Sequence, residues 1–218
     1  MQSISEPTLK RLPRYLMYLK QVRETGKENI SGPGIAHDLG LDPTQVTKDL
    51  SVLGLTGKTR VGFEVNELIV GLEEFLGFRR KNEAFLVGAG KLGQALMNYD
   101  SFADYGLKIV AAFDTNKSII GEEINKIQVF PIEKFRDLAS RLHIIFGIIT
   151  TPASSAQFVA DMMVSWGIKA IWNFAPVNLK LPSGIVVQNT SLYEGLAVMY
   201  NKIQSILDAQ PLNNKSKS

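Results

Sequence analysis

The chain has 218 residues, of which 45% are hydrophobic and 21% charged, as in ordinary globular proteins. It contains no cysteine, which excludes disulfides, thiolate zinc sites and thiol redox chemistry. Its two histidines, His37 and His143, lie far apart, so no metal site is expected. The N-terminus lacks a secretory pattern, and no apolar run approaches the roughly 18 residues that span a bilayer. We therefore expect a cytoplasmic protein without a membrane partner.

Positive charge gathers in the first part of the chain. Residues 1–60 contain nine Lys or Arg and six Asp or Glu, which accounts for the whole net charge of +3. Such an excess favours a polyanionic partner, although a solvated charged surface has the same composition.

The first third of the chain is predicted to be helical. Apolar spacing indicates helices over residues 8–24, 35–39, 43–53 and 65–76. Pro13 is expected to begin a second helical segment. Asp42 and Gly40 are suited to cap the helices beside them. Residues 54–62 favour a short hairpin with a basic tip, and the charged residues 79–83 mark a domain boundary.

The two short helices on either side of Gly40 resemble a helix-turn-helix. The second would expose side chains that hydrogen-bond base edges or phosphates, namely Thr44, Gln45, Thr47, Lys48 and Ser51. Val46, Leu50 and Leu53 would face the core. With Lys58 and Arg60 on the hairpin, the segment is predicted to be a DNA-binding winged helix. A small protein-binding helical domain is the alternative.

Strands and helices alternate after residue 83. Strands are expected over residues 84–87, 107–113, 144–150, 170–174 and 185–188, with helices to residue 97 and over residues 154–166. This alternation indicates a Rossmann-type doubly wound parallel sheet with helices on both faces.

A final helix is expected over residues 192–207. One of its faces is apolar, formed by Leu196, Met199, Ile203 and Ile206. No later strand covers that face. Residues 210–218 are polar and are expected to be disordered.

The stretch Gly88-Ala89-Gly90-Lys91-Leu92-Gly93 follows a strand, opens a helix and lies 21 residues before Asp114. Gly88 would permit a tight turn, Gly90 would let backbone N–H groups approach a pyrophosphate, and Gly93 would let helix and strand pack closely. Asp114 would accept hydrogen bonds from the adenosine ribose and repel a 2′-phosphate, which favours NAD over NADP. A tight turn without a ligand is the alternative.

Two more strand ends fall at the same edge of the predicted sheet, where ligands bind in such folds. They carry Thr151-Pro152 and Asn173-Phe174, which are predicted to contact the cofactor. A strand-ending proline and a turn-forming asparagine are the alternatives.

A dehydrogenase would need a proton donor or acceptor beside its substrate. His143 precedes its strand, which puts it at the wrong edge of the sheet. Tyr99 and Tyr105 are not followed by the lysine of a Tyr-x-x-x-Lys arrangement. No catalytic residue is predicted, and the chain is not expected to be an enzyme.

Five stretches in order resemble the Rex family of redox-sensing transcriptional repressors, across about residues 8–207. They are residues 8–13, 45–51, 87–93, 111–114 and 173–177. The resemblance implies a homodimer with swapped C-terminal helices, NAD(H) bound between the domains, and release from a palindromic DNA operator by NADH. Arg11, within the first stretch, joins the predicted DNA contacts.

The resulting prediction is an α/β protein with four segments. They are an N-terminal winged helix-turn-helix domain (1–82), a Rossmann NAD(H)-binding domain (83–190), a swapped dimerisation helix (191–208) and a disordered tail (209–218).

The chain departs from the Rex pattern at several positions. The wing has Leu53, Thr56 and Arg60 where the family has aromatics and an extra glycine. Thr47 replaces an arginine of the recognition helix, and Lys91 replaces an asparagine of the glycine turn. Met17 and Ser191 stand where the family has an interdomain ion pair. A small NAD(H)-dependent oxidoreductase with a helical dimerisation domain and a CoA-binding module are the rival hypotheses. Asp114 disfavours CoA, whose ribose carries a 3′-phosphate.

Overall fold

The computed structural model describes residues 4–55, 57–58 and 61–209. The chain divides into two compact units. The first contains Met1–Asn82 and Ser101–Leu107, and the second contains Glu83–Asp100 and Lys108–Ser218. None of the helices in the described ranges is long and apolar enough to cross a membrane.

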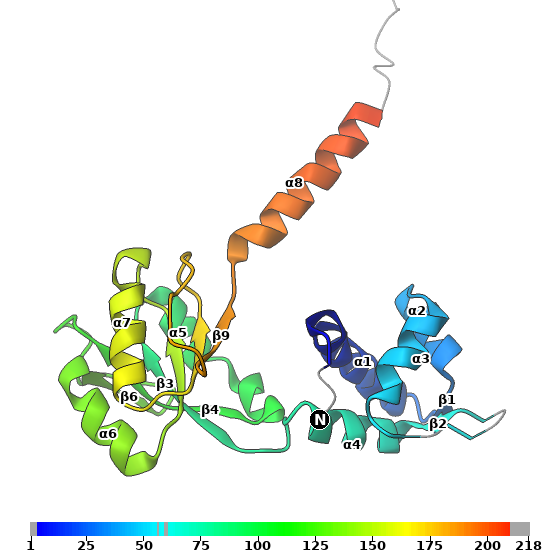
Figure 1. Cartoon of the computed structure of the whole chain (residues 1–218), viewed down its shortest axis with the longest axis horizontal. Helices are drawn as coiled ribbons and strands as arrows, with labels where there is room; N and C mark the ends of the chain where they lie inside the picture. Colours follow the sequence, from blue (N-terminus) through cyan, green and yellow to red (C-terminus); the bar gives the residue numbers. More distant parts are fainter. Residues whose placement is uncertain (1–3, 56, 59–60, 210–218) are drawn as a thin grey trace, which may run out of the picture. The chain divides into compact units, whose positions relative to one another are not determined.

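The first unit is helical with a small sheet (Figure 1). Its elements are α1 (Glu6–Glu24), β1 (Asn29–Ile30), α2 (Gly32–Leu39), α3 (Pro43–Ser51), β2 (Phe63–Glu64) and α4 (Val65–Phe75). The strands β1 and β2 pair in antiparallel orientation. Asp42 caps α3 by accepting from the Gln45 N–H at 2.9 Å, and Gly40 ends α2 with φ +64°, as predicted.

The structure corrects one prediction in this unit and adds a strand that was not predicted. Pro13 lies inside α1, which is one continuous helix rather than two segments. Buried Leu12 and Leu16 pack the turns around Pro13 into the core, so packing holds the helix where proline removes a hydrogen bond. The strand β1 was not predicted, because two residues are too short to show alternation. Within the hairpin region, Lys58 and Gly62 form an isolated antiparallel bridge.

The described strands of the second unit form one seven-stranded sheet in the order β5-β6-β4-β3-β7-β8-β9. They are β3 (Asn82–Val87), β4 (Leu107–Asp114), β5 (Glu123–Ile124), β6 (Ile127–Pro131), β7 (Phe146–Ile149), β8 (Ala170–Asn173) and β9 (Val186–Asn189). The chain starts in the centre at β3, builds outward through β4 and β6, then returns to β7 on the other side. This order is that of the dinucleotide-binding fold, so the Rossmann-type prediction is confirmed.

The helices of the second unit are α5 (Lys91–Met97), α6 (Phe135–Leu142), α7 (Ala153–Ser165) and α8 (Leu192–Ala209), with a short 3-10 turn at η2 (Ile132–Lys134). A second 3-10 turn, η1 (Asp100–Tyr105), belongs to the first unit except for its first residue. Phe85, Phe113 and Phe135 form the aromatic centre of its core, with ring centroids 4.8 to 5.2 Å apart. The strands β5 and β6 and the helix α6 were not predicted.

The helix α8 exposes apolar side chains along its length. They are Tyr193, Leu196, Val198, Met199, Tyr200, Ile203, Ile206 and Leu207. The predicted apolar face therefore exists and is uncovered in the single chain. Ala209 is the last residue of α8, so the predicted tail does not begin there. The rest of that prediction, residues 210–218, lies outside the described residues.

Candidate functional site

Two of the three glycines in the turn between β3 and α5 are required by the fold on steric grounds, and the third is not. Gly88 has φ +105°, and a Cβ there would lie 2.8 Å from the carbonyl carbon of Thr150. A Cβ on Gly93 would lie 2.1 Å from the Gly88 oxygen, so this position needs glycine for close packing. A Cβ on Gly90 would meet nothing within 4 Å, which leaves open space above the turn.

The carboxylate of Asp114 is held at the end of β4 by backbone donors. Its Oδ2 accepts from the Ala89 N–H at 2.8 Å. Its Oδ1 accepts from the N–H groups of Thr115 and Asn116 at 2.7 and 2.8 Å. The acid is half-buried, so a fixed negative charge stands beside the glycine turn.

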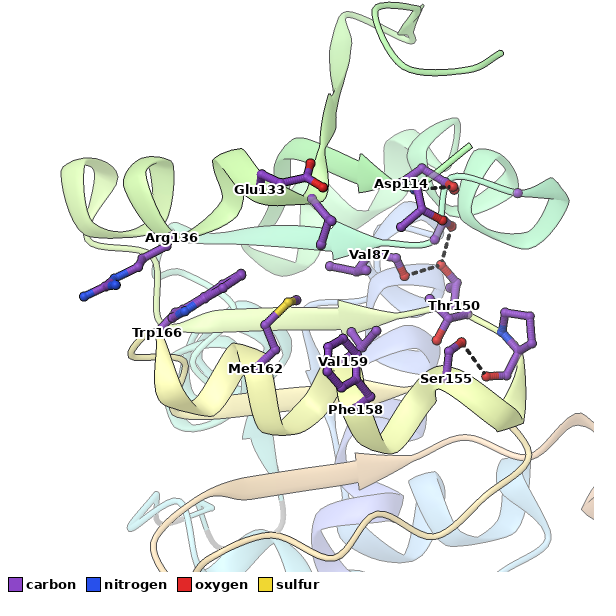
Figure 2. Close-up of a pocket in the computed structure, with 16 residues that line it drawn as sticks. Val87, Asp114, Glu133, Arg136, Thr150, Ser155, Phe158, Val159, Met162 and Trp166 are labelled. Carbon is purple, nitrogen blue, oxygen red and sulfur yellow. Dashed lines mark hydrogen bonds between the residues drawn. The ribbon is translucent and has the colours of Figure 1, made fainter. Parts of the chain in front are cut away.

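A cavity of about 680 Å³ opens at this edge of the sheet, and Gly88, Gly90 and Asp114 line it. Figure 2 shows Asp114 and Thr150 at one end and Arg136 and Trp166 at the other. This cavity is large enough for a drug-sized ligand.

A second cavity of about 380 Å³ continues from the first. Gly90, Thr150, Thr151 and Pro152 line both cavities. The smaller one also contacts two more of the predicted cofactor residues, Leu92 and Phe174, together with Pro176, Ser191 and Tyr193. The two cavities therefore meet at the glycine turn.

Two threonines at the end of β7 have different surroundings. The Thr150 hydroxyl donates to the Gly88 oxygen at 2.7 Å and ties β7 to the turn. The Thr151 Oγ1 is buried without a hydrogen-bond partner among the described residues. A buried hydroxyl left unpaired costs free energy, so a polar ligand atom fits at this position. The open space above Gly90 and the unpaired Thr151 hydroxyl both suit a phosphate-bearing ligand.

Four predicted cofactor residues do not line these two cavities. Ala89 gives its N–H to Asp114, Lys91 is exposed at the start of α5, and Gly93 is buried in packing. Asn173 is fully buried, and its Nδ2 donates to the oxygens of Ala175, Val177 and Asn189. Asn173 thus shapes the turn that carries Phe174 to the smaller cavity.

Other residues lining the larger cavity were missed by sequence reasoning. Glu133 and Arg136 come from η2 and α6, which were not predicted. Phe158, Met162 and Trp166 follow one another at intervals of four along α7 and its end (Figure 2). That helical spacing was a signal that could have indicated a shared face.

The exposed side of α3 forms an open depression of about 470 Å³. It brings together four predicted DNA contacts, Thr44, Thr47, Lys48 and Ser51. The Thr47 hydroxyl donates to the Pro43 oxygen at 2.9 Å, while Lys48 is exposed. Lys58 is also exposed. Arg60 lies outside the described residues.

Two further predicted contacts, Arg11 and Gln45, meet at the buried carboxylate of Asp49, which is 1% exposed. Arg11 Nε donates to Oδ2 at 2.6 Å, and its Nη2 donates to Oδ1 at 2.8 Å. Gln45 Nε2 and the Thr8 hydroxyl donate to Oδ1 at 3.0 and 3.1 Å. The Tyr15 hydroxyl donates to Oδ2 at 2.7 Å. Sequence reasoning missed Asp49, although it lies three residues after core-facing Val46.

The Asp49 carboxylate and the Arg11 guanidinium stay ionised at neutral pH. Burial alone would raise the pKa of Asp49, but hydrogen bonds from Arg11, Tyr15 and Thr8 outweigh it and hold that pKa below its ordinary value. Burial, with the nearby carboxylate, raises the pKa of Tyr15 to about 12. The hydrogen bond to Asp49 raises the pKa of Arg11.

The fold and these two sites define a two-domain α/β protein, with a winged helix-turn-helix unit before a Rossmann-type unit. No cluster of three or more His, Cys, Asp or Glu that could hold a metal occurs in the ranges the structure describes. Two family models match the chain. One is described as a putative DNA-binding protein N-terminus and matches residues 3–51. The other is described as a CoA binding domain and matches residues 79–177.

Curated relatives match most of the chain. A redox-sensing transcriptional repressor Rex from Bacteroides fragilis is 44% identical over 92% of this chain and 91% of its own length. One from Treponema denticola is 40% identical over 88% of this chain and 92% of its own length. The chain therefore belongs to the Rex family.

Solved structures agree with this assignment. RSP, a Rex-family repressor, in complex with beta-NAD+ and operator DNA has a TM-score of 0.89 and 34% identity, covering 95% of this chain and 96% of RSP. RSP in complex with beta-NADH has a TM-score of 0.85 and 34% identity, covering 95% and 98%.

Proposed function

We propose that this chain is a transcriptional repressor that binds palindromic operator DNA and senses the NADH/NAD+ ratio, with NADH binding releasing the DNA. The observation that carries the proposal is the pair of cavities that meet at Gly90 and Thr151, with a fixed carboxylate in one of them. Solved complexes of a 34% identical Rex-family repressor with NAD+, NADH and operator DNA support it.

The larger cavity takes the adenosine half of the cofactor. Asp114 accepts a hydrogen bond from a ribose hydroxyl through the one lone pair of Oδ2 that its backbone donors leave free, and its charge disfavours a 2′-phosphate. The pyrophosphate lies over Gly90, within the predicted turn from Gly88 to Gly93, and the Thr151 hydroxyl donates to it. The Thr151 hydroxyl has no hydrogen-bond partner among the described residues, which supports that role.

The smaller cavity takes the nicotinamide half. Phe174 and Pro152 provide apolar surface there. Asn173 acts indirectly, because its amide holds the turn before Pro176. Lys91, exposed at the start of α5, adds positive charge close to the pyrophosphate.

The first unit binds DNA through α3 in the major groove. Thr44, Thr47, Lys48 and Ser51 share one open surface, as a helix facing base edges and phosphates requires. Lys58 and Arg60 of the wing bind phosphates or the minor groove. Arg11 and Gln45, which both bond Asp49, make further contacts to the DNA beside this surface.

The exposed apolar face of α8 supports a homodimer in which each C-terminal helix inserts into the partner. A stripe of exposed Leu, Met and Ile is unfavourable in water and is covered by association. A two-fold dimer presents two α3 helices to a palindrome.

The protein regulates rather than catalyses. Neither histidine lines the two cavities, and the lining holds no arrangement typical of a hydride-transfer enzyme. With DNA and NADH as ligands, the protein acts in the cytoplasm. NADH shifts the population toward a state with low DNA affinity, and each ~1.4 kcal/mol of preference changes that affinity tenfold.

Two separate binding measurements test the proposal. NADH is titrated calorimetrically into the full-length protein, and bound duplexes are selected from a palindromic library. We expect saturable NADH binding and an enriched palindrome. NADH turnover with common aldehydes or 2-oxo acids would support the oxidoreductase instead, and tighter binding of CoA than NADH would support the CoA-binding module.

A further inference from the structure

We infer that Asp49 is a positioning residue that fixes the amide of Gln45 for reading an adenine in the operator. The inference rests on the proposed DNA-binding function of α3 and deepens it. Gln45 and Asp49 lie four residues apart on one helix, so their side chains are neighbours along its surface. The Gln45 Nε2 donates to Asp49 Oδ1 at 3.0 Å.

The charge of Asp49 decides which way the amide turns. An ionised carboxylate accepts hydrogen bonds and donates none, so only the NH2 end of Gln45 can face it. We assign the Nε2 hydrogen trans to Oε1 to this hydrogen bond, and in the planar amide that choice points Oε1 away from Asp49. The other Nε2 hydrogen stays beside Oε1. Together these two groups form the acceptor and donor pair that matches adenine N6 and N7 in the major groove.

Asp49 is itself held from several sides. Arg11 binds both carboxylate oxygens, and Tyr15 donates to Oδ2, whereas Gln45 bonds Oδ1. Asp49 is 1% exposed, so its position is set by the core of the first unit. The hydrogen bond to Asp49 therefore orients the Gln45 amide before DNA binds, which lowers the entropic cost of making a base contact.

The Asp49 cluster also occupies the guanidinium of Arg11 at two of its nitrogens. The pair is neutral overall, so Asp49 contributes to base choice rather than to attraction for phosphates. A merely structural Asp49 would change DNA affinity by the same factor for all sequences. A positioning role changes the preference at a particular base pair.

The test measures base preference rather than affinity alone. The preferred palindrome of the full-length wild-type protein is selected from a duplex library, and every single-base variant is then competed at equilibrium. We expect Gln45→Ala to remove a preference for adenine of about tenfold at one base pair of each half-site. Asp49→Ala should lower that same preference at least threefold and leave preferences elsewhere unchanged. Adding Asp49→Ala to Gln45→Ala should change it no further.

Asp38→Ala is the matched control, because it removes a carboxylate of the first unit that contacts Tyr18 and His37 and not Gln45. It should keep the wild-type preference. Each preference is a ratio within one protein sample, so partial unfolding does not alter it. Unchanged preference in Asp49→Ala, or in Gln45→Ala, overturns the inference while DNA binding stands. Failure of the wild type to enrich any duplex overturns the proposed function instead.

A second measurement needs no Asp49 variant. The side-chain amide of Gln45 in the wild-type protein is assigned by NMR from its loss in Gln45→Ala. Its heteronuclear NOE should approach that of the α3 backbone, unlike the exposed Gln21 of α1. A Gln45 amide as mobile as that of Gln21 contradicts the inference, even if Asp49→Ala does not fold.

Discussion

The Oδ2 of Asp114 accepts a hydrogen bond from the backbone N–H of Ala89 at 2.8 Å, which joins the end of β4 to the glycine turn after β3. The acidic residue and the turn are therefore one structural unit. A change at Asp114 acts on the ribose contact and on the shape of the turn together.

Asp114→Asn should weaken NADH binding by about tenfold and reduce the preference for NADH over NADPH. The amide loses the charge that repels a 2′-phosphate, and it accepts fewer hydrogen bonds. Fluorescence titrations with both cofactors measure this. Glu122→Gln, at an exposed acid outside the cavities, should behave like the wild type. Equal discrimination in wild type and Asp114→Asn would contradict the assigned ribose contact.

Two alanine substitutions in the glycine turn should affect different properties, one the stability of the second unit and the other its NADH affinity. Gly93→Ala puts a Cβ 2.1 Å from the Gly88 oxygen, so it should destabilise the second unit by about 3 kcal/mol. Gly90 has φ −71°, which any residue adopts, and its Cβ meets no protein atom. Gly90→Ala should therefore keep its melting temperature and lose at least about tenfold in NADH affinity, because the methyl occupies the pyrophosphate position.

Thermal unfolding and NADH titration of the two variants separate these outcomes. A Gly90→Ala protein that binds NADH like the wild type would show that the phosphate does not lie over Gly90.

The sequence predicted the centre of the sheet because its strands are apolar runs next to glycine turns. Gly88 to Gly93 and Asp114 were recognisable from spacing alone. The edge of the sheet that contains β5 and β6 was harder to predict. The strand β5 has two residues, and α6 begins directly after a 3-10 turn, so neither shows a full period. Because η2 and α6 were not predicted, Glu133 and Arg136 were not predicted either.

Long-range contacts explain the rest of what the sequence did not predict. Pro13 is tolerated in α1 because neighbouring side chains are buried in the core. The tendency of proline to break helices is judged from the local sequence, which does not show this burial. Asp49 is charged and was therefore not placed in the core. Its burial depends on Arg11 and Tyr15, which are more than 30 residues away in sequence.

Lys48→Ala should weaken DNA binding for all sequences and reduce the salt dependence. One phosphate contact fewer lowers the slope of log K against log salt by about 0.9. Lys169→Ala, at an exposed lysine of the second unit, is the matched control and should leave the slope unchanged. The measurement is fluorescence anisotropy of labelled operator at several salt concentrations. An unaltered slope in Lys48→Ala would remove this lysine from the phosphate contacts.

Met199→Glu should convert the dimer to a monomer, because a charge would be buried where the apolar face of α8 meets its partner. Asn201→Glu introduces the same charge on the polar side of α8 and should remain dimeric. Sedimentation equilibrium distinguishes the two. A dimeric Met199→Glu protein would place the dimer contact elsewhere.

Acid should destabilise the first unit through Asp49. Its folded pKa is below the ordinary value of 3.8, so its stabilising effect is complete above that value and is lost as pH falls through the folded pKa. Asp49→Asn should be less stable than the wild type at pH 6, and the difference should shrink below about pH 4. Thermal melts across this range measure it. A difference that stays constant down to pH 2.5 would contradict the lowered pKa.

The most direct measurement titrates NADH, and separately NAD+, into the full-length protein bound to its selected palindromic operator. NADH should release the DNA in a saturable manner at concentrations where NAD+ does not. Gly90→Ala should need at least about tenfold more NADH than the wild type to release the operator. If NADH binds the wild-type protein while its affinity for the operator stays the same, the protein does not sense NADH, and the central claim is wrong.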